Sequence, residues 1–474
     1  MNASLKQTIY YAAGLVISKG MALIMLPYVT QVLSVEEYGV LEILLVIANF
    51  SCVILGFGLV GAMFRFIGNT NSESEKQKIL NVVFTLVLII SGVSFILLQL
   101  VVDWGLGSMP ASVTQTQLRL IIITLVLDGL IAIPLSYLRI KDRARTYFLL
   151  TLSKEIAQLL MIFFLLENGF GVTGVIAAGA ITSIIFVILL LLISLPEFKL
   201  KFDYFLLRKL IIYGFPLVIS GIAGFIILGL DRWLLANSLG VEVLAHYAIA
   251  IKFTLIVSMM VQPYGLWWYP RRFSVLRTES GLTQTARYSS IGVCLGLIAA
   301  CFIGLVSPII IDLLLPKEYD VAKQYIPFLV ICMAIKNASE FMNIGCFSEE
   351  TSNTQMWINL VCCLIAILGY VLLIEYYEVF GVIITLLFCY LVRFVLFYWA
   401  SQRVIFIPYP NKGLVDIFLL VCYILYANQY FQATAYNLCY VIFSMSVLML
   451  LCFRLKLLPQ VTKLVFFGKT VQAV

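Results

Sequence analysis

The sequence predicts an all-α integral membrane protein with about 14 transmembrane helices. Of its 474 residues, 62% are hydrophobic and 12% are charged, and the mean hydropathy is +1.06. A membrane helix needs about 20 mostly apolar residues to cross roughly 30 Å of hydrocarbon. Fourteen such helices would use about 280 residues, which is close to the apolar share of the chain. The apolar runs are continuous, whereas a transmembrane β-strand would alternate.

The apolar runs place each expected span. They cover residues 9–34, 38–66, 79–102, 118–140, 146–167, 172–195, 209–238, 243–269, 287–315, 323–346, 353–375, 379–400, 414–430 and 432–453. The first run is interpreted as a span and not as a cleaved signal, because no small-residue cleavage pattern follows it. The last two runs are short and weakly separated, so 12 or 13 spans are the alternatives.

The loops between these spans differ in charge from one side of the membrane to the other. Arg139, Lys141, Arg143 and Arg145 form one of several basic clusters that recur in every second loop. Short basic loops stay in the cytoplasm, so both termini are expected there, in a multi-pass protein of the plasma membrane. The formal net charge of +7 is thereby explained as a topology signal, and no nucleic-acid partner is expected.

The connections leave no room for an additional catalytic domain, and we expect the protein not to be an enzyme. One basic connection is "PEFKLKFDYFLLRKL" at residues 196–210. It alternates basic and apolar residues, so we expect it to lie along the inner surface and to link two halves. A plain polar connector is the alternative.

Two pairs of similar segments indicate an internal duplication. "LSVEEYG" at 33–39 is similar to "LGVEVLA" at 239–245, and "GLVGAMFRF" at 58–66 is similar to "GLWWYPRRF" at 265–273. The two offsets differ by a single residue, and six spans separate the copies. An even number of spans predicts halves of parallel topology, and transporters bind their substrates between such halves. Chance similarity between apolar segments is the alternative.

Charged residues within the spans are the candidate site. An ionisable group at the centre of a bilayer costs about 2.5–3.5 kcal/mol on insertion scales, so it is a functional candidate by default. Arg65 and Arg393 are less informative, since long side chains near helix ends can reach the interface. The remaining candidates are Lys19, Asp128, Asp231, Arg232, Lys252, Lys336 and Glu340.

Helical spacing tests whether these groups share a face with other polar residues. At 3.6 residues per turn, Ser220, Gly224, Asp231 and Ser238 form one stripe in the seventh span. Asp231 continues this stripe, while Arg232 projects about 100° away. The two could line a cavity, or they could form a structural ion pair that holds two helices together.

Lys336 and Glu340 present a similar choice, because opposite charges at i and i+4 can neutralise each other. Cations outnumber anions among the candidates, which favours an anionic ligand such as a phosphate or pyrophosphate. We therefore expect substrate binding by Lys19, Arg232, Lys252 and Lys336, and ion coupling by Asp128, Asp231 and Glu340. The single histidine and the spacing of the 11 cysteines predict no metal site.

Two longer segments resemble the Wzx-type polysaccharide flippases of bacterial envelopes. They are "LPYVTQVLSVEEYGVLEI" at 26–43 and "YGFPLVISGIAGFIILGLDRWLLANSLGVEVLAHYAIAIKF" at 213–253. These flippases belong to the superfamily of multidrug, oligosaccharidyl-lipid and polysaccharide exporters. The resemblance covers nearly the whole chain, although its motifs are loose.

The resemblance implies two six-helix lobes related by a pseudo-twofold axis, followed by two additional helices. The expected boundaries are 1–198 for the N-terminal lobe, 199–405 for the C-terminal lobe and 406–474 for the two helices and a cytoplasmic tail. It also implies a location in the bacterial inner membrane and flipping of an undecaprenyl-pyrophosphate-linked oligosaccharide by alternating access. No cofactor is expected beyond coupling to H⁺ or Na⁺.

The resemblance further implies a polysaccharide polymerase and a chain-length regulator as partners, besides the lipid-linked glycan and membrane lipid. Relatives that flip the peptidoglycan precursor carry an arginine-rich first helix, whereas only Lys19 stands in the first span here. This departure favours O-antigen or capsule units. A multidrug or small-metabolite antiporter of the same fold is one alternative. An envelope polysaccharide polymerase or ligase is another, but it would be expected to carry a long extracytoplasmic loop.

Overall fold

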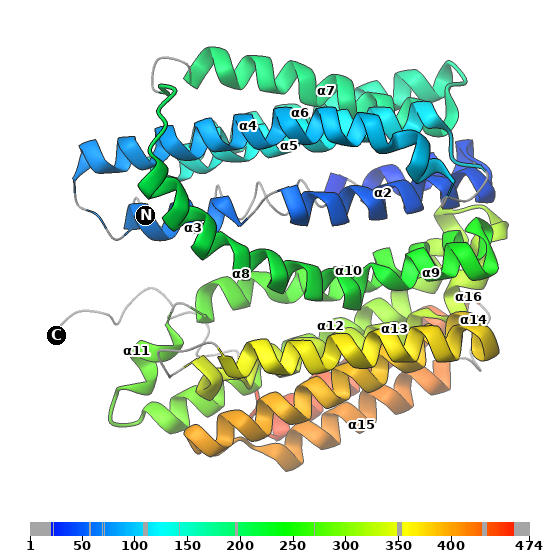
Figure 1. The fold of residues 1–474 in the computed structure, drawn as a ribbon. Coiled ribbons are helices and arrows are strands. Elements are labelled where there is room, and N and C mark those ends of the chain that lie inside the picture. Colours follow the sequence, from blue (N-terminus) through cyan, green and yellow to red (C-terminus); the bar gives the residue numbers. More distant parts are fainter. Residues whose placement is uncertain are drawn as a thin grey trace. The chain divides into compact units, whose positions relative to one another are not determined.

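The computed structural model describes residues 20–458, except for positions 22, 56–57, 69, 71, 108–111, 142, 195–197, 270, 348–352 and 429–433. All regular secondary structure in these residues is helical, as predicted (Figure 1). The chain divides into two compact units, Met1–Ala248 and Ile249–Val474. The lobe boundaries expected at 198/199 and 405/406 remain predictions.

The first unit contains a helix at Leu23–Val32 followed by eight further helices. Helices α4, α5, α6 and α7 pack in succession, and α5 also contacts α2 and α3. The bounds are α2 (Val35–Leu55), α3 (Leu59–Gly68), α4 (Glu73–Leu106), α5 (Gln115–Ile140), α6 (Ala144–Glu167), α7 (Gly171–Ser194), α8 (Tyr204–Leu228) and α9 (Leu230–Leu239). Helix α10 (Val241–Trp268) begins in this unit and ends in the next.

The second unit is built around α12, which contacts α13, α15 and α16. Its α14 is really two helices in sequence, because Glu378 leaves the helical conformation, with φ of 51° and ψ of −128°. The bounds are α11 (Arg272–Leu276), α12 (Gly281–Leu314), η1 (Lys317–Gln324), α13 (Ile326–Phe341), η2 (Ile344–Phe347), α14 (Asn353–Val404), α15 (Asn411–Ala427) and α16 (Thr434–Arg454).

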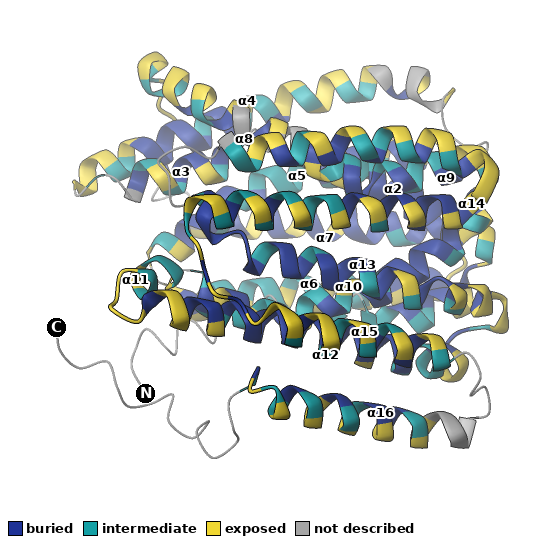
Figure 2. Ribbon diagram, turned by 90° about the horizontal axis from the view of Figure 1, so that it is seen from below, coloured by how far each residue is buried: buried dark blue, intermediate teal, exposed yellow. Residues whose placement is uncertain are grey.

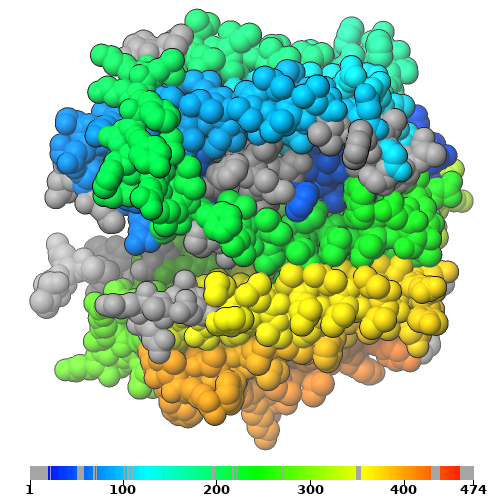
Figure 3. Space-filling view, in the orientation of Figure 1, coloured from blue at the N-terminus to red at the C-terminus, as the bar shows by residue number. Residues whose placement is uncertain are grey.

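These helices coincide with the predicted spans, apart from the first, of which only the second half is described. Within the described residues, eight helices are long and apolar enough to cross a membrane, and Leu23–Val32 and Leu438–Arg454 are shorter apolar helices. Most long helices carry both buried and exposed residues (Figure 2), and on the face drawn in Figure 3 the side chains of neighbouring helices lie against one another. The protein is therefore a multi-pass membrane protein.

Two predicted spans are broken into shorter helices. The span expected at 38–66 contains α2, which ends at Leu55, and α3, which begins at Leu59 directly after Gly58 at φ of +59°. The span expected at 209–238 becomes α8 and α9, with Gly229 between them at φ of −146°. The polar stripe predicted from Ser220 to Ser238 is therefore not continuous, because a break resets the angular spacing of side chains that a single helix maintains.

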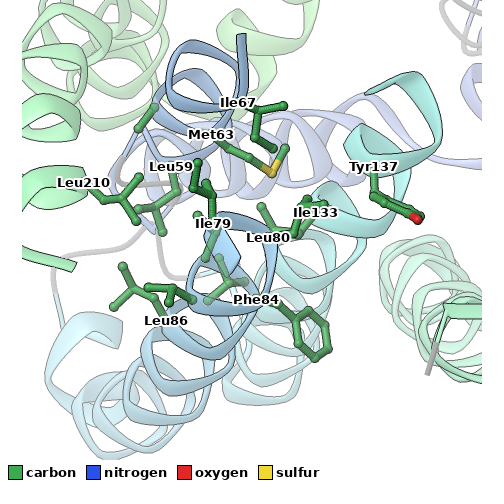
Figure 4. Close-up of a cluster of buried hydrophobic side chains, with 14 of the residues drawn as sticks. Leu59, Met63, Ile67, Ile79, Leu80, Phe84, Leu86, Ile133, Tyr137 and Leu210 are labelled. Carbon is green, nitrogen blue, oxygen red and sulfur yellow. The ribbon is translucent and has the colours of Figure 1, made fainter. Parts of the chain in front are cut away.

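A buried apolar cluster joins α3, α4, α5 and α8 at one end of the first unit (Figure 4). Leu59 and Met63 of α3 are fully buried against Leu80 of α4. Leu210 of α8 enters the same cluster and is also fully buried. In a membrane such side chains hold helices together by close van der Waals packing, so the cluster fixes the start of α8 against α3 and α4.

The connection before α8 lies against α4 in an extended conformation. Phe198 packs on Phe84 and Tyr137, and the backbone N–H of Lys199 donates to Asn81 Oδ1 at 3.0 Å. Asp203 caps α8 by accepting from the N–H of Leu206 at 3.0 Å. Lys78 Nζ lies 2.5 Å from Asp203 Oδ2, and the hydrogen bond from this ammonium group lowers the pKa of the Asp203 carboxyl. The connection is thus anchored by its alternating apolar and polar residues.

The two copies of the first repeated motif meet inside the first unit. A Cβ added to Gly39 would lie 1.9 Å from the carbonyl oxygen of Val241, so the backbones of α2 and α10 touch there. Gly240 joins α9 to α10 at φ of +94°, a conformation that favours glycine. The motif residues thus form a tight junction of α2 with the α9–α10 corner. The predicted duplication itself remains a prediction.

Candidate functional site

The charged candidates are distributed over both units, which are described separately. Asp128, Asp231 and Arg232 belong to the first unit, and Lys252, Lys336 and Glu340 belong to the second. Lys19 lies outside the described residues. The roles assigned to all seven residues remain predictions, but six of them now have a structural environment.

Asp231 is the most deeply buried of these groups, with 1% of its surface exposed. It lies in the first turn of α9, where free backbone N–H groups and the helix dipole favour a negative charge. The hydroxyl of Tyr247, on α10, donates a hydrogen bond to Asp231 Oδ2 at 2.6 Å. The other carboxylate oxygen is buried without a well-formed hydrogen bond. Asp231 therefore ties the start of α9 to α10.

Arg232 is adjacent in sequence but has a different environment. It is partly exposed, and its Nε is buried without a hydrogen-bond partner. Arg232 attracts Asp231 electrostatically, yet the side-chain hydrogen bond to that carboxylate comes from Tyr247. Arg232 is thus partly exposed, but its buried unbonded donor, Nε, faces the protein interior.

Asp128 forms an ion pair that the sequence analysis did not identify. Lys154 Nζ lies 2.8 Å from Asp128 Oδ1, and the hydroxyl of Ser183 donates to the same oxygen at 3.1 Å. The three residues come from α5, α6 and α7. The sequence did contain a signal for Lys154. It is a charged residue in the middle of the predicted span 146–167, and the two neighbouring spans carry Asp128 and Ser183 at similar depth.

Glu340 is paired with Arg393, which the sequence analysis had treated as a residue reaching the interface. Arg393 Nη1 lies 3.7 Å from Glu340 Oε1 and donates to Ser339 Oγ at 3.0 Å. The arginine side chain is only 13% exposed, because it packs over the ring of Phe397. Arg393 therefore bridges α13 and α14 within the second unit.

Lys252 and Lys336 are both partly buried. Each has at least one polar or electrostatic partner, so neither is an isolated cation. Lys336 also supplies its backbone carbonyl to the hydroxyl of Ser339 at 2.6 Å. Both lysines lie within membrane helices, where a charged side chain must face protein or water and not lipid. The binding role assigned to them stays a prediction.

Arg65 and Arg272 occupy equivalent positions in the second repeated motif, and both lie over aromatic rings. The guanidinium of Arg65 is 4.3 Å from the centre of the Tyr213 ring. That of Arg272 is 4.6 Å from the centre of the Phe347 ring, and it donates to Asn343 Oδ1 at 3.3 Å. Each arginine is therefore held in its own unit by cation–π contacts.

A cavity of about 270 Å³ lies elsewhere in the second unit, between α12, α13, α14 and α15. Its walls are mostly apolar, and Tyr398 and Asn411 supply polar groups that bond to each other. None of the predicted charged residues lines it. Among the described residues, no three His, Cys, Asp or Glu side chains are grouped as metal ligands would be.

Comparison with solved structures identifies the fold. The chain is similar to a lipid II flippase MurJ in an inward closed conformation, with a TM-score of 0.73 and 14% identity over 94% of this chain and 99% of that one. It is also similar to an inward-facing multidrug resistance MATE family transporter of the MOP superfamily, with a TM-score of 0.61 and 16% identity over 86% and 96%. At these identities the similarity shows the fold alone, which this chain shares with the flippase and the multidrug transporter.

A further similar structure is a MOP superfamily transporter from Pyrococcus furiosus, with a TM-score of 0.56 and 14% identity over 84% of this chain and 95% of that one. Residues 4–276 match the family model for polysaccharide biosynthesis proteins, which is more than half of the chain. The chain therefore belongs to the polysaccharide biosynthesis protein family. A search of curated proteins finds no match.

Proposed function

We propose that this protein flips an undecaprenyl-pyrophosphate-linked oligosaccharide repeat unit across the bacterial inner membrane, for O-antigen or capsule synthesis. Membership of the polysaccharide biosynthesis family is the observation that carries the proposal. The fold shared with a lipid II flippase supports it. In this proposal the lipid tail stays in the bilayer while the sugar–pyrophosphate headgroup crosses by alternating access, coupled to H⁺ or Na⁺.

The charged side chains support an anionic headgroup. Arg232, Lys252 and Lys336 are cationic groups within the helices, and none is fully buried. Ammonium and guanidinium groups bind phosphate oxygens through charge-assisted hydrogen bonds. Lys19 is proposed for the same role from the sequence alone. Asp128, Asp231 and Glu340 are the carboxylates proposed to respond to the coupling ion.

A multidrug antiporter would have the same fold, since multidrug transporters are among the similar structures. A cationic drug would favour acidic groups, whereas a pyrophosphate favours the lysines and the arginine. Transport of organic cations by the purified protein, without flipping of a lipid-linked glycan, would therefore select the alternative.

The proposal can be tested with proteoliposomes that contain a polyprenyl-pyrophosphate-linked oligosaccharide. A membrane-impermeant glycosidase would report how much substrate reaches the outer leaflet over time. We expect wild-type protein to accelerate this exposure, Lys336→Gln to slow it about tenfold, and Lys336→Arg to retain most of it, because charge is the required property. Lys412→Gln changes an exposed lysine at the start of α15 and serves as the matched control.

Protein levels and monodispersity must be equal in all variants. Wild-type protein that fails to expose the substrate with or without an ion gradient would contradict the proposed function. Full activity of Lys336→Gln would instead remove Lys336 from the binding site without contradicting the function.

A further inference from the structure

The ion pair of Asp128 and Lys154 lies at the middle of three consecutive membrane helices. Asp128 on α5, Lys154 on α6 and Ser183 on α7 are each within two residues of the centre of their helix. Consecutive antiparallel helices of similar length place such residues at the same depth. Transporters of related architecture bind substrates near the bilayer midplane, so this depth is suited to a substrate contact.

Lys154 points away from the lipid-facing side of α6. The strongly exposed apolar residues of α6 include Leu149, Leu160 and Phe164, at 51%, 66% and 60% exposure. At 100° per residue, Lys154 lies roughly 140° around the helix from Leu149. Its ammonium is 5.9 Å from the centre of the Phe186 ring on α7. The lysine is thus directed toward the seam between α5, α6 and α7.

The seam continues with polar side chains one helical turn away. The side chains of Gln158 on α6 and Thr124 on α5 both come within 3.8 Å of the position that a Cβ on Gly179 would occupy. These residues are four positions from Lys154, Asp128 and Ser183, respectively. Polar side chains of α5 and α6 therefore extend the site by one helical turn on one side of the ion pair, at the level of Gly179 on α7.

The two partners of the pair are buried to different extents. The Lys154 side chain is 17% exposed, while that of Asp128 is 41% exposed. If Lys154 left the pair, Asp128 would keep its hydrogen bond from Ser183, and in a water-filled transport path its exposed surface would be hydrated. Removing the partner of a carboxylate costs much less there than at a fully buried site. The flexible four-carbon stem of lysine also permits it to reorient toward another anion.

We propose that Lys154 binds the phosphate oxygens of the transported headgroup. In the absence of substrate its ammonium group is paired with Asp128, and the phosphate replaces this carboxylate when the substrate binds. This inference rests on the proposed function, because it requires a substrate that carries a phosphate or pyrophosphate. The exchange is one of hydrogen-bond partners: the ammonium leaves Asp128 Oδ1 and donates to a phosphate oxygen. The ligand class is a lipid-linked diphosphate.

The competition predicts effects of opposite sign for the two partners. With farnesyl diphosphate as the probe and purified protein in detergent, calorimetry should show about tenfold tighter binding to Asp128→Asn, equivalent to ~1.4 kcal/mol. Lys154→Gln should bind about tenfold more weakly, and the double variant should resemble Lys154→Gln. Farnesol, which lacks the diphosphate, should bind to the wild-type protein and to all variants with the same affinity.

Asp312→Asn is the matched control, because Asp312 is a carboxylate paired with Lys323 in the second unit. It removes the same charge and should leave the affinity unchanged. Unchanged or weaker binding to folded Asp128→Asn, together with unchanged binding to Lys154→Gln, would overturn the inference. If Asp128→Asn does not fold, the test is the affinity of Lys154→Arg and Lys154→Gln for farnesyl diphosphate. Equal affinities would overturn the inference, and weaker binding by Lys154→Gln alone would support it.

The same proteins can be assayed for flipping in proteoliposomes, which separates the two proposals. If the wild-type protein flips the substrate but substitutions of Asp128 and Lys154 leave binding unchanged, only the proposed role of Lys154 is contradicted, and the proposed function is not. Absence of wild-type flipping would contradict the proposed function.

Discussion

Asp128 and Asp231 are two carboxylates within membrane helices of the same compact unit, and their surroundings differ in kind. Asp128 is partly exposed and bonded to an ammonium at 2.8 Å. Asp231 is fully buried, is bonded to the hydroxyl of Tyr247 at 2.6 Å, and lies at the start of a helix. The first arrangement keeps a mobile cation available. The second uses neutral donors and a helix dipole in a closely packed corner.

This difference distinguishes the proposed exchange of partners at Asp128 from the enclosed Asp231, whose bond to Tyr247 also holds α9 against α10, whatever its part in ion coupling. In a closed environment, each lost contact leaves a polar group without water to replace it. In an accessible one, water or a ligand can take over. We therefore expect substitutions in the junction of α2 with the α9–α10 corner to act on stability, and substitutions in the α5–α6–α7 seam to act mainly on binding.

The largest expected effect is that of Gly39→Ala. The new Cβ would lie 1.9 Å from the carbonyl oxygen of Val241, so the backbones must separate. We expect a loss of about 3 kcal/mol or more in the free energy of unfolding, at the upper end for overpacked sites. Thermal unfolding in detergent would measure it. Gly92→Ala, whose Cβ would meet nothing within 4 Å, should be harmless; equal losses would show that the junction is not closed.

A smaller effect is expected for Tyr247→Phe. The ring keeps its packing, but Asp231 loses the hydrogen bond to Oδ2. Leaving a buried acceptor unsatisfied costs about 1–3 kcal/mol, which should appear as a lower unfolding midpoint. Tyr423→Phe removes a hydroxyl from a side chain that is 68% exposed and is the control. An unchanged unfolding midpoint in Tyr247→Phe would show that another donor replaces the hydroxyl at Asp231, as we expect at the more exposed Asp128.

The smallest expected effect is that of Ser183→Ala. Asp128 keeps its ion pair with Lys154 and loses only the bond from the serine hydroxyl at 3.1 Å. We expect about 0.5–1.5 kcal/mol in unfolding free energy, measured in the same thermal assay. Ser290→Ala, whose hydroxyl bonds only to the carbonyl of Ala286 in its own helix, is the matched control. A loss larger than that of Tyr247→Phe would reverse the comparison.

The sequence could predict the helices because their cause is local. Continuous apolar runs must form helices in a membrane, where each backbone polar group needs an internal partner. This is why the predicted spans at 118–140 and 172–195 coincide with α5 and α7. The charged candidates were also visible in the sequence, since Asp128 and Asp231 stand out in apolar surroundings. The sequence analysis did not predict that the seventh span is broken at Gly229, because an isolated glycine in a helical pattern is also tolerated in unbroken helices.

The partners of the charged residues were decided by tertiary structure. The sequence left open whether Asp231 and Arg232 line a cavity or form an ion pair, and it did not indicate that the hydroxyl donor to Asp231 is Tyr247 on the next helix. Arg393 was expected to extend toward the interface, but Glu340 and Ser339 hold it inside the second unit. Lys154 and Asp128 are 26 residues apart and meet only because α5 and α6 pack together. Composition and periodicity determine which residues enter the membrane, whereas helix packing determines which of them touch, because side-chain contacts depend on distances that no single helix contains.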